Sequence, residues 1–154
     1  MQGCWKGNFV NRHYYIKKND IINPKIKQKF DLITCISVLE HISNHETAIS
    51  SMFNLLKNKG YLLLTFPYNE KQYIENVYKL PGAGYGGNSP YICQVFSRKE
   101  ITEWLSKNGG HIVEQEYYEI FTGDFWSLGK HVYPPCKVNK DNKHHLTCLL
   151  IQKL

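Results

Sequence analysis

Two apolar runs separated by one amphipathic segment constrain the fold of this chain more than any other feature. Residues Phe30–Leu39 are almost continuously apolar, which is typical of a strand buried on both faces. A second apolar run covers Tyr61–Phe66 and is ended by Pro67. Between the two runs, apolar residues recur at helical spacing over positions 48–56. This order of strand, helix and strand predicts a parallel βαβ unit.

Capping residues mark the ends of the predicted helices. Ser43 and Glu46 have the spacing of a capping box, in which two side chains satisfy free amides at a helix start. Gly60 follows this helix and suits the left-handed position that ends it. Ser97 and Glu100 repeat the capping-box spacing before a second helix, which two glycines end.

The remaining segments complete an α/β pattern. We predict an early strand at Tyr14–Lys18, a strand at His111–Phe121 and a last strand at His145–Gln152. A loop containing Pro134 and Pro135 separates the last two. The sum predicts an α/β sheet that is mostly parallel, with an antiparallel last strand.

Residues 67–95 form a long irregular stretch, which we interpret as a lid or substrate insertion. Its tyrosines, Tyr85 and Tyr91 among them, are candidates to cover a substrate, and packing against the sheet is the alternative. Gly82–Gly87 match G-x-G-x-x-G, but Pro81 precedes them and no helix follows. A dinucleotide fingerprint needs a strand before it and a helix after it, so this segment is not a phosphate loop.

Length and composition narrow the class of protein. The 154 residues suffice for one domain, and no apolar run approaches the roughly 18 residues of a membrane span. Five widely spaced cysteines, an odd number, argue against a disulfide scaffold and favour a cytoplasmic protein. The net charge of +6 is spread over scattered lysines, which argues against a dedicated nucleic-acid binder.

The best candidate site lies where the first apolar run ends, at Ser37, Glu40 and His41. In open α/β sheets, ligands bind outside the carboxyl ends of the strands. A carboxylate and an imidazole there can position a substrate and accept its proton, or they can simply cap the next helix. The residues after the next strand are expected to bind substrate beside them: Pro67, Tyr68 and Asn69.

Two further groups of residues have chemical potential. Asp124 lies in a loop that either contributes to an acceptor pocket or forms a turn. Four others are of metal-binding type but lack the spacing of a zinc ribbon or finger: Cys136, His144, His145 and Cys148.

Two motifs resemble class I S-adenosylmethionine (SAM)-dependent methyltransferases. Phe30–Ile42, with Glu40 and His41 near its end, is similar to the fourth-strand motif of that superfamily. Leu55–Pro67 is similar to the segment that follows, although Asn58 replaces the usual proline there. The later helix and the last two strands resemble the superfamily's last helix and its sixth and seventh strands.

The resemblance implies SAM as cofactor and methyl transfer to a small-molecule acceptor, with oxygen as the expected acceptor atom. It places Asp20 and Ile21 against the adenine of the cofactor, and it places Ser37 and Leu39 in the cofactor lining. It also places the Glu-His pair toward the acceptor, with the histidine as base. Some relatives carry a metal-binding glutamate where this chain has Ser37, so we predict no metal site.

The resemblance also sets an expectation about what is missing. The superfamily's glycine-rich cofactor loop has no counterpart in Met1–His13. We therefore expect a single partial methyltransferase domain over residues 1–154, truncated at the N-terminus. The alternative is a non-catalytic, truncated protein or a subunit that completes another chain's sheet. In either case we expect a homodimer or a partner chain to cover the exposed sheet edge.

Overall fold

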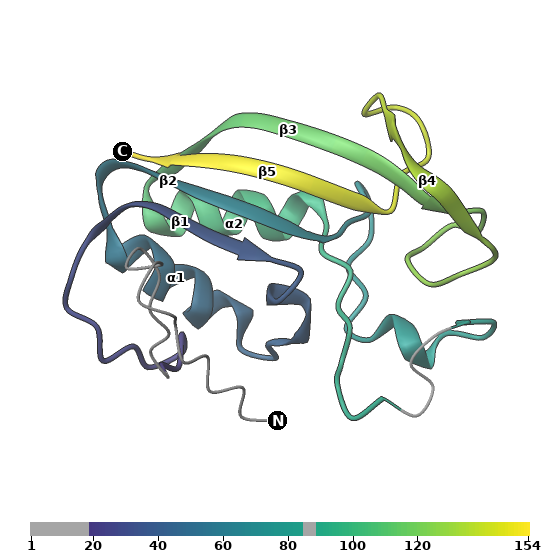
Figure 1. Cartoon of the computed structure of the whole chain (residues 1–154), viewed down its shortest axis with the longest axis horizontal. Helices are drawn as coiled ribbons and strands as arrows, with labels where there is room; N and C mark the ends of the chain where they lie inside the picture. The colour runs from purple at the N-terminus through teal and green to yellow at the C-terminus, as the bar shows by residue number, and fades with distance from the viewer. Residues whose placement is uncertain (1–18, 85–88) are drawn as a thin grey trace, which may run out of the picture.

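The computed structural model describes residues 19–84 and 89–154, which form one five-stranded sheet with two helices (Figure 1). The strands are β1 (Phe30–Ile36), β2 (Leu56–Pro67), β3 (Gly110–Phe121), β4 (His131–Val138) and β5 (Leu146–Lys153). The helices are α1 (His45–Leu55) and α2 (Arg98–Asn108), and two short 3-10 turns are η1 (Leu39–His41) and η2 (Val77–Lys79). The strand predicted at Tyr14–Lys18 and the candidate Tyr85 lie outside the described residues.

The strands lie in the order β1-β2-β5-β3-β4. β1 and β2 pair in parallel, with α1 as their connection, and β5 is antiparallel to both of its neighbours, which confirms the predicted α/β fold and the antiparallel last strand. β3 and β4 also pair antiparallel. Over the described residues the sheet is therefore mixed, with the parallel pairing at β1 and β2. No crossover helix separates β3, β4 and β5, and both β4 and β5 run antiparallel to β3, one on each side of it.

β4 corrects the prediction of a plain loop between the last two strands. The segment with Pro134 and Pro135 pairs with β3 at the end of the sheet. Proline lacks the N–H that a central strand must donate, but an edge strand tolerates it. Because prolines are atypical of a strand, the sequence pattern did not indicate β4.

The main core lies between the sheet and the two helices, which cover the same face (Figure 1). Alternate residues of β2 point into it, and Leu62, Leu64 and Phe66 are completely buried. The indole of Trp104 in α2 packs edge-on against Phe66, with 5.7 Å between ring centroids. The period of two in a strand thus places every second side chain of β2 under the helices.

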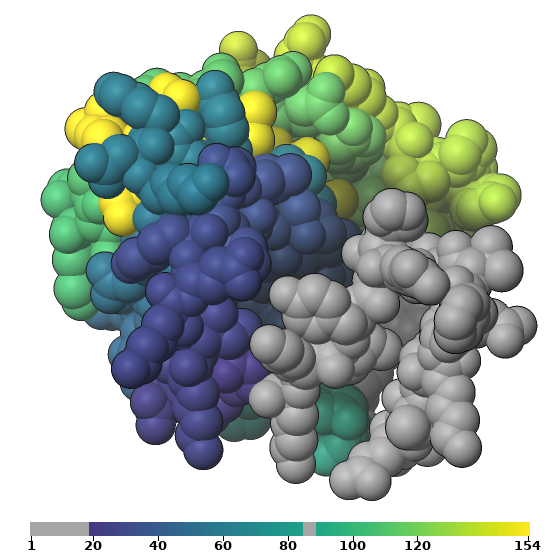
Figure 2. Space-filling model, turned by 60° about the vertical axis from the view of Figure 1, so that its left-hand side comes forward, coloured from purple at the N-terminus to yellow at the C-terminus, as the bar shows by residue number. Residues whose placement is uncertain are grey.

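The opposite face of the sheet and the outer edge of β1 are more open. Leu32 is 54% exposed and Ile36 is 50% exposed. Figure 2 shows β1 and the residues before it, in purple to dark blue, at the surface of the molecule. Among residues 19–84 and 89–154, β1 pairs only with β2. This edge therefore leaves backbone hydrogen-bonding groups unpaired within the described structure.

The helix starts follow the predicted chemistry with one shift. The N-cap of α1 is Asn44 rather than Ser43, and its side chain accepts a hydrogen bond from the backbone N–H of Thr47. At α2 the predicted capping box of Ser97 and Glu100 is confirmed, with both reciprocal hydrogen bonds present. Asparagine and serine are about equally good N-caps, so Asn44 can cap α1 as well as Ser43 could.

Gly60 has a different reason for being glycine than the sequence suggests. The left-handed residue in this turn is Lys59, with φ of 62°. A Cβ on Gly60 would lie 2.9 Å from the carbonyl oxygen of Lys57 and 3.1 Å from that of Asp31. Glycine is therefore required by the close approach of backbone carbonyl oxygens from β1 and β2 at the start of their pairing.

The stretch from Tyr68 to Val95 is irregular, as predicted, but it has a small core of its own. Ile74, Val77, Cys93 and Val95 are buried together. Isolated bridges pair Ile74 with Val95 and Tyr68 with Phe96, which draws the two ends of the stretch together. Among the described residues, no helix is long and apolar enough to span a membrane.

Replacing Gly60 with alanine tests the close backbone approach. We expect Gly60→Ala to lower the free energy of unfolding by about 1–3 kcal/mol, the usual cost of overpacking, because carbonyl oxygens of a paired strand cannot move aside. Urea unfolding followed by tryptophan fluorescence measures this. Asn58→Ala, at an exposed position of β2, is the matched control and should change the free energy little. Equal midpoints for the two variants would contradict the assignment.

Candidate active site

The end of β1 turns sharply at Ser37, which has a positive φ of 50°. Its backbone N–H is 3.0 Å from both the carbonyl oxygen and the hydroxyl oxygen of Thr65 on β2. These contacts hold the turn against the neighbouring parallel strand. They bring the following turn, η1, to the carboxyl edge of the sheet, where ligands bind in α/β folds.

Glu40 in η1 is a buried carboxyl group, only 4% exposed. Its Oε1 is 3.9 Å from Nε2 of His41, and its Oε2 has no hydrogen-bond partner within the described residues. Burial raises the pKa of this carboxyl, while its own backbone N–H and the neighbouring histidine act in the opposite direction. A carboxyl in these surroundings is poised to hold a proton or to face a cation.

His41 is half-exposed beside this carboxyl, and its ring orientation is fixed by a backbone group. Nδ1 lies 2.7 Å from the carbonyl oxygen of Ile92. A carbonyl oxygen can only accept, so Nδ1 carries the proton in the neutral imidazole and Nε2 keeps its lone pair. Nε2 is the atom that faces Glu40. The ring is therefore arranged to accept a proton at Nε2.

Tyr91 contributes to the same site. Its side chain is 63% exposed, and its ring packs at a tilt against the His41 ring, with 6.0 Å between centroids. The structure thus brings the predicted catalytic pair, Glu40 and His41, together with one predicted substrate residue. Tyr91 comes from the long irregular stretch, about fifty positions along the chain from the pair.

The residues predicted to bind the cofactor lie near β1. An apolar hollow of about 260 Å³ runs beside this strand. Val38 and Ile42, which flank η1, line it together with Ile21. The other lining residues are Ile33, Thr34, Cys35, Ile36 and Met52.

The other expected cofactor residues lie close to this hollow. The carboxylate of Asp20 accepts the backbone N–H of Ile22 at 3.0 Å, which shapes the turn that carries Ile21. Ser37 is exposed at the end of β1, whereas Leu39 is completely buried in the main core. An apolar hollow with polar groups at its rim fits a purine, whose flat faces pack against apolar side chains and whose edge carries hydrogen-bonding nitrogens.

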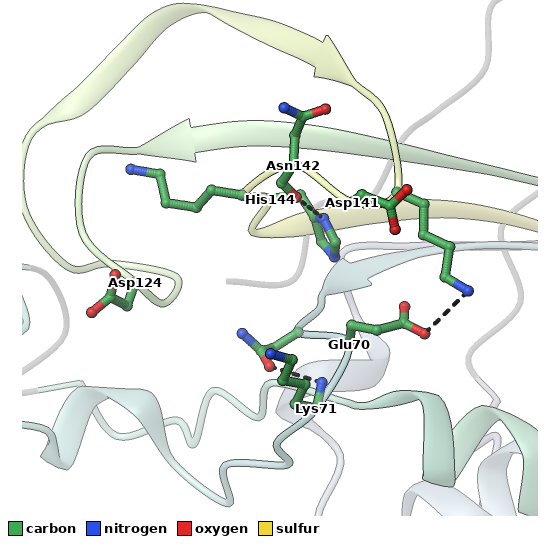
Figure 3. A pocket seen from close by; sticks show the side chains of 9 residues that line it. Glu70, Lys71, Asp124, Asp141, Asn142 and His144 are labelled. Atoms are coloured by element: carbon green, nitrogen blue, oxygen red, sulfur yellow. Dashed lines mark hydrogen bonds and ion pairs between the residues drawn. The ribbon is translucent and has the colours of Figure 1, made fainter.

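The residues expected at the end of β2 divide between the core and a second hollow. Pro67 and Tyr68 are buried. Asn69 lines a polar hollow of about 450 Å³ at the same edge of the sheet, together with Asp124 from the loop after β3 (Figure 3). Its other lining residues are Glu70, Lys71, Lys140, Asp141, Asn142, Lys143 and His144. In Figure 3, Asp124 and Asp141 lie on opposite sides of this hollow.

A half-buried polar network that includes Glu70, one of the lining residues, holds Tyr68 beside this hollow. The Tyr68 hydroxyl donates to Glu70 at 2.6 Å, and Glu70 forms a two-pronged ion pair with Arg98 at 3.0 and 3.1 Å. Burial raises the pKa of Glu70, but the Arg98 guanidinium and the Tyr68 hydroxyl outweigh burial and hold that pKa below its usual range. The His144 ring stacks on Tyr68, with 5.6 Å between centroids. Tyr68 therefore supports the strand end rather than facing a ligand directly.

Sequence reasoning missed the residues that act through the backbone or from a neighbouring strand. Ile92 contributes only its carbonyl oxygen to His41, and no side-chain pattern signals that. Thr65 could have been found, because it is the polar residue in the apolar run Tyr61–Phe66. The candidate metal-binding group does not assemble: within residues 19–84 and 89–154, no cluster of three His, Cys, Asp or Glu side chains is placed to hold a metal ion. His145 instead accepts from the backbone N–H of Ile120 at 3.2 Å.

Comparison with known proteins assigns the family. The family described as "Methyltransferase domain" matches residues 5–115. A ubiquinone biosynthesis O-methyltransferase of Glaesserella parasuis is 32% identical over 108 residues, which are 64% of this chain and 44% of that protein. A protein of the same name from Coxiella burnetii is 30% identical over 112 residues, 68% of this chain and 46% of the relative. The chain therefore spans about half the length of these curated relatives.

A solved structure agrees at the level of the fold. A SAM-dependent methyltransferase of Thermotoga maritima superposes with a TM-score of 0.59 at 16% identity, over 94% of this chain and 67% of that one. Because the family match covers more than half of its residues, the chain belongs to this methyltransferase family, and thus to the class I SAM-dependent methyltransferase superfamily. The predicted resemblance is confirmed.

The buried carboxyl of Glu40 predicts a pH-dependent stability. Its pKa is raised in the folded state, so its contribution to stability is present below the ordinary glutamate pKa and is lost as pH rises through the folded pKa. We expect Glu40→Gln to raise the free energy of unfolding at pH 7, with a smaller gain at pH 4. Urea unfolding at both values measures this, with the exposed Glu75→Gln as control. A gain that is equal at both pH values would contradict a buried, ionising carboxyl.

Proposed function

We propose that this domain transfers a methyl group from SAM to an oxygen atom of a small molecule, with His41 as the base. One observation carries the proposal: the Ile92 carbonyl sets the His41 ring so that Nε2 keeps its lone pair, beside Glu40 and the apolar hollow. Both curated relatives are named O-methyltransferases, which supports oxygen as the acceptor atom. The family match over residues 5–115 includes the end of β1.

The chain's own residues fit the cofactor at the hollow beside β1. Ile21 and the apolar side chains of β1 would hold the adenine ring, with Asp20 at the rim and Ser37 toward the sheet edge. Leu39 would support this lining from the core, where it is completely buried. When bound, SAM supplies an electrophilic methyl carbon on its sulfonium.

The catalytic role of the pair follows from the fixed ring. Nε2 of His41 takes the proton from the acceptor hydroxyl while Nδ1 stays bonded to Ile92. Glu40, with its Oε1 3.9 Å from Nε2, stabilises the imidazolium that forms. A half-exposed ring lets an acceptor approach, while little solvent reaches the buried Glu40 carboxyl beside it.

The segment at residues 67–95 is proposed as the part that covers and selects the acceptor. Tyr91 contacts the His41 ring, and Asn69 lines the polar hollow with Asp124. Tyr85 belongs to the same segment, and its substrate role stays a prediction. The substrate roles of Pro67 and Tyr68 also stay predictions, and these two residues would act by supporting Asn69. A polar hollow of this kind fits an acceptor that carries several hydrogen-bonding groups.

A non-catalytic role as a subunit that completes another chain's sheet is the second candidate. The open outer edge of β1 favours it, with Leu32 and Ile36 exposed along the strand. A homodimer or a partner chain would pair with this edge. The cytoplasm is the proposed location, because the four described cysteines, at positions 35, 93, 136 and 148, are all free thiols.

Cofactor binding and one histidine variant test the proposed reaction. We expect the full 154-residue chain to bind S-adenosylhomocysteine in calorimetry and to transfer labelled methyl groups from SAM to hydroxylated intermediates of ubiquinone biosynthesis. His41→Asn should lower kcat by about 10²–10⁴-fold, the usual contribution of a general base, without changing the Kd for S-adenosylhomocysteine. His111→Asn, at an exposed position of β3, is the control. A folded chain that binds no S-adenosylhomocysteine would instead support the non-catalytic role.

A further inference from the structure

Gln94 is a buried amide whose every bonding partner belongs to the turn with the catalytic pair or to the segment that faces it. Its side chain is 1% exposed. Nε2 donates to the carbonyl oxygens of Ile42 at 2.9 Å and Glu40 at 3.3 Å, and Oε1 accepts the Tyr73 hydroxyl at 2.7 Å. Its backbone N–H also donates to the Glu40 carbonyl oxygen at 3.0 Å. Both N–H groups of the side-chain amide are thus used on η1 and on Ile42, the residue that follows it.

The chemistry of this position requires an amide. Two carbonyl oxygens need two donors on one nitrogen, and a hydroxyl that donates from the other side needs an acceptor. A carboxylate of the same shape would present oxygen to both carbonyls and would lose both bonds. The network also fixes which end of the amide is nitrogen, because only that assignment satisfies all three partners.

The same short segment holds both the main chain and the side chain of the catalytic turn. Gln94 binds the carbonyls on either side of His41, and the carbonyl of Ile92, two positions earlier, binds Nδ1 of that histidine. The distance from the Ile92 carbonyl to the imidazole therefore depends on how firmly η1 is tied to this segment. Gln94 alone supplies three hydrogen bonds between this segment and the turn, two from its side chain and one from its backbone N–H.

We propose that Gln94 is the positioning residue of the active site: its amide locks η1 onto the segment at residues 92–94, so that His41 is held with Nδ1 protonated and Nε2 free. This inference rests on the proposed function for its catalytic consequence. Its structural content, the protonation state and orientation of one imidazole, stands apart from any activity.

The decisive measurement is the nitrogen NMR spectrum of the His41 imidazole in the full chain, assigned by the signal that His41→Asn removes. In the wild-type chain we expect the Nδ1–H form. In Gln94→Glu we expect a shift toward the Nε2–H form that free histidine favours, because the ring loses its fixed carbonyl partner. We also expect kcat to fall about 10- to 100-fold with KM and the Kd for S-adenosylhomocysteine within about twofold, as expected for a misplaced catalytic group.

Gln28→Glu is the matched control, since it makes the same chemical change at an exposed position before β1, outside the proposed site. It should leave the tautomer of His41 and the kinetics unchanged. If Gln94→Glu does not fold, Gln94→Met, which keeps the length and adds no charge, is measured against the same criterion. A folded variant with an unchanged His41 tautomer, or a wild-type chain with the Nε2–H form, would overturn the proposal. If the tautomer shifts but the wild-type chain shows no methyl transfer, the positioning role stands and the proposed reaction fails.

Discussion

The parallel pairing of β1 with β2 is the constraint on which the site depends. It places the two carboxyl ends side by side, with Ile36 opposite Thr65, and the Ser37 amide closes the end of β1 onto the same threonine. The register also requires Gly60 at the start of the pairing, where carbonyl oxygens of β1 and β2 approach closely. A slip by one residue would reverse every side chain of β1 between the helix face and the open face. The end of β1, and with it Glu40, would then leave the sheet edge.

The turn after β1 contains carbonyl groups and an imidazole that have no hydrogen-bond partner within the turn itself. The long stretch after β2 is needed to bond them. Each carbonyl left unbonded in a buried turn costs about 1–3 kcal/mol. The stretch supplies the missing partners, with Gln94 for two carbonyls and Ile92 for the imidazole. Its own small core, around Val77 and Cys93, makes this support rigid. The irregular stretch therefore completes the site instead of only covering it.

The sequence was sufficient for features that depend on local chemistry or on hydrophobic period. The buried strands, the capping box at Ser97 and the Glu40–His41 pair at a strand end all follow from such patterns. β4 was missed because Pro134 and Pro135 break the pattern, although an edge strand tolerates them. The roles of Gly60 and Ile92 depend on backbone atoms that residues distant in the sequence bring near. Backbone contacts of this kind leave no trace in side-chain type, so they could not be predicted from sequence alone.

The division of the candidate residues between two hollows bears on how the activity is built. Ile21 and β1 form an apolar hollow, whereas Asn69 and Asp124 line a polar one at the same edge of the sheet. An apolar hollow suits the adenine ring of the cofactor, which all members of a superfamily share. A polar hollow suits groups that distinguish one acceptor from another. Glu40 and His41 are tied to the stretch that links β2 to α2, and Asn69 opens the same stretch. On the proposed function, a change of acceptor need not disturb β1, but any change in this stretch must preserve the hydrogen bonds that hold η1.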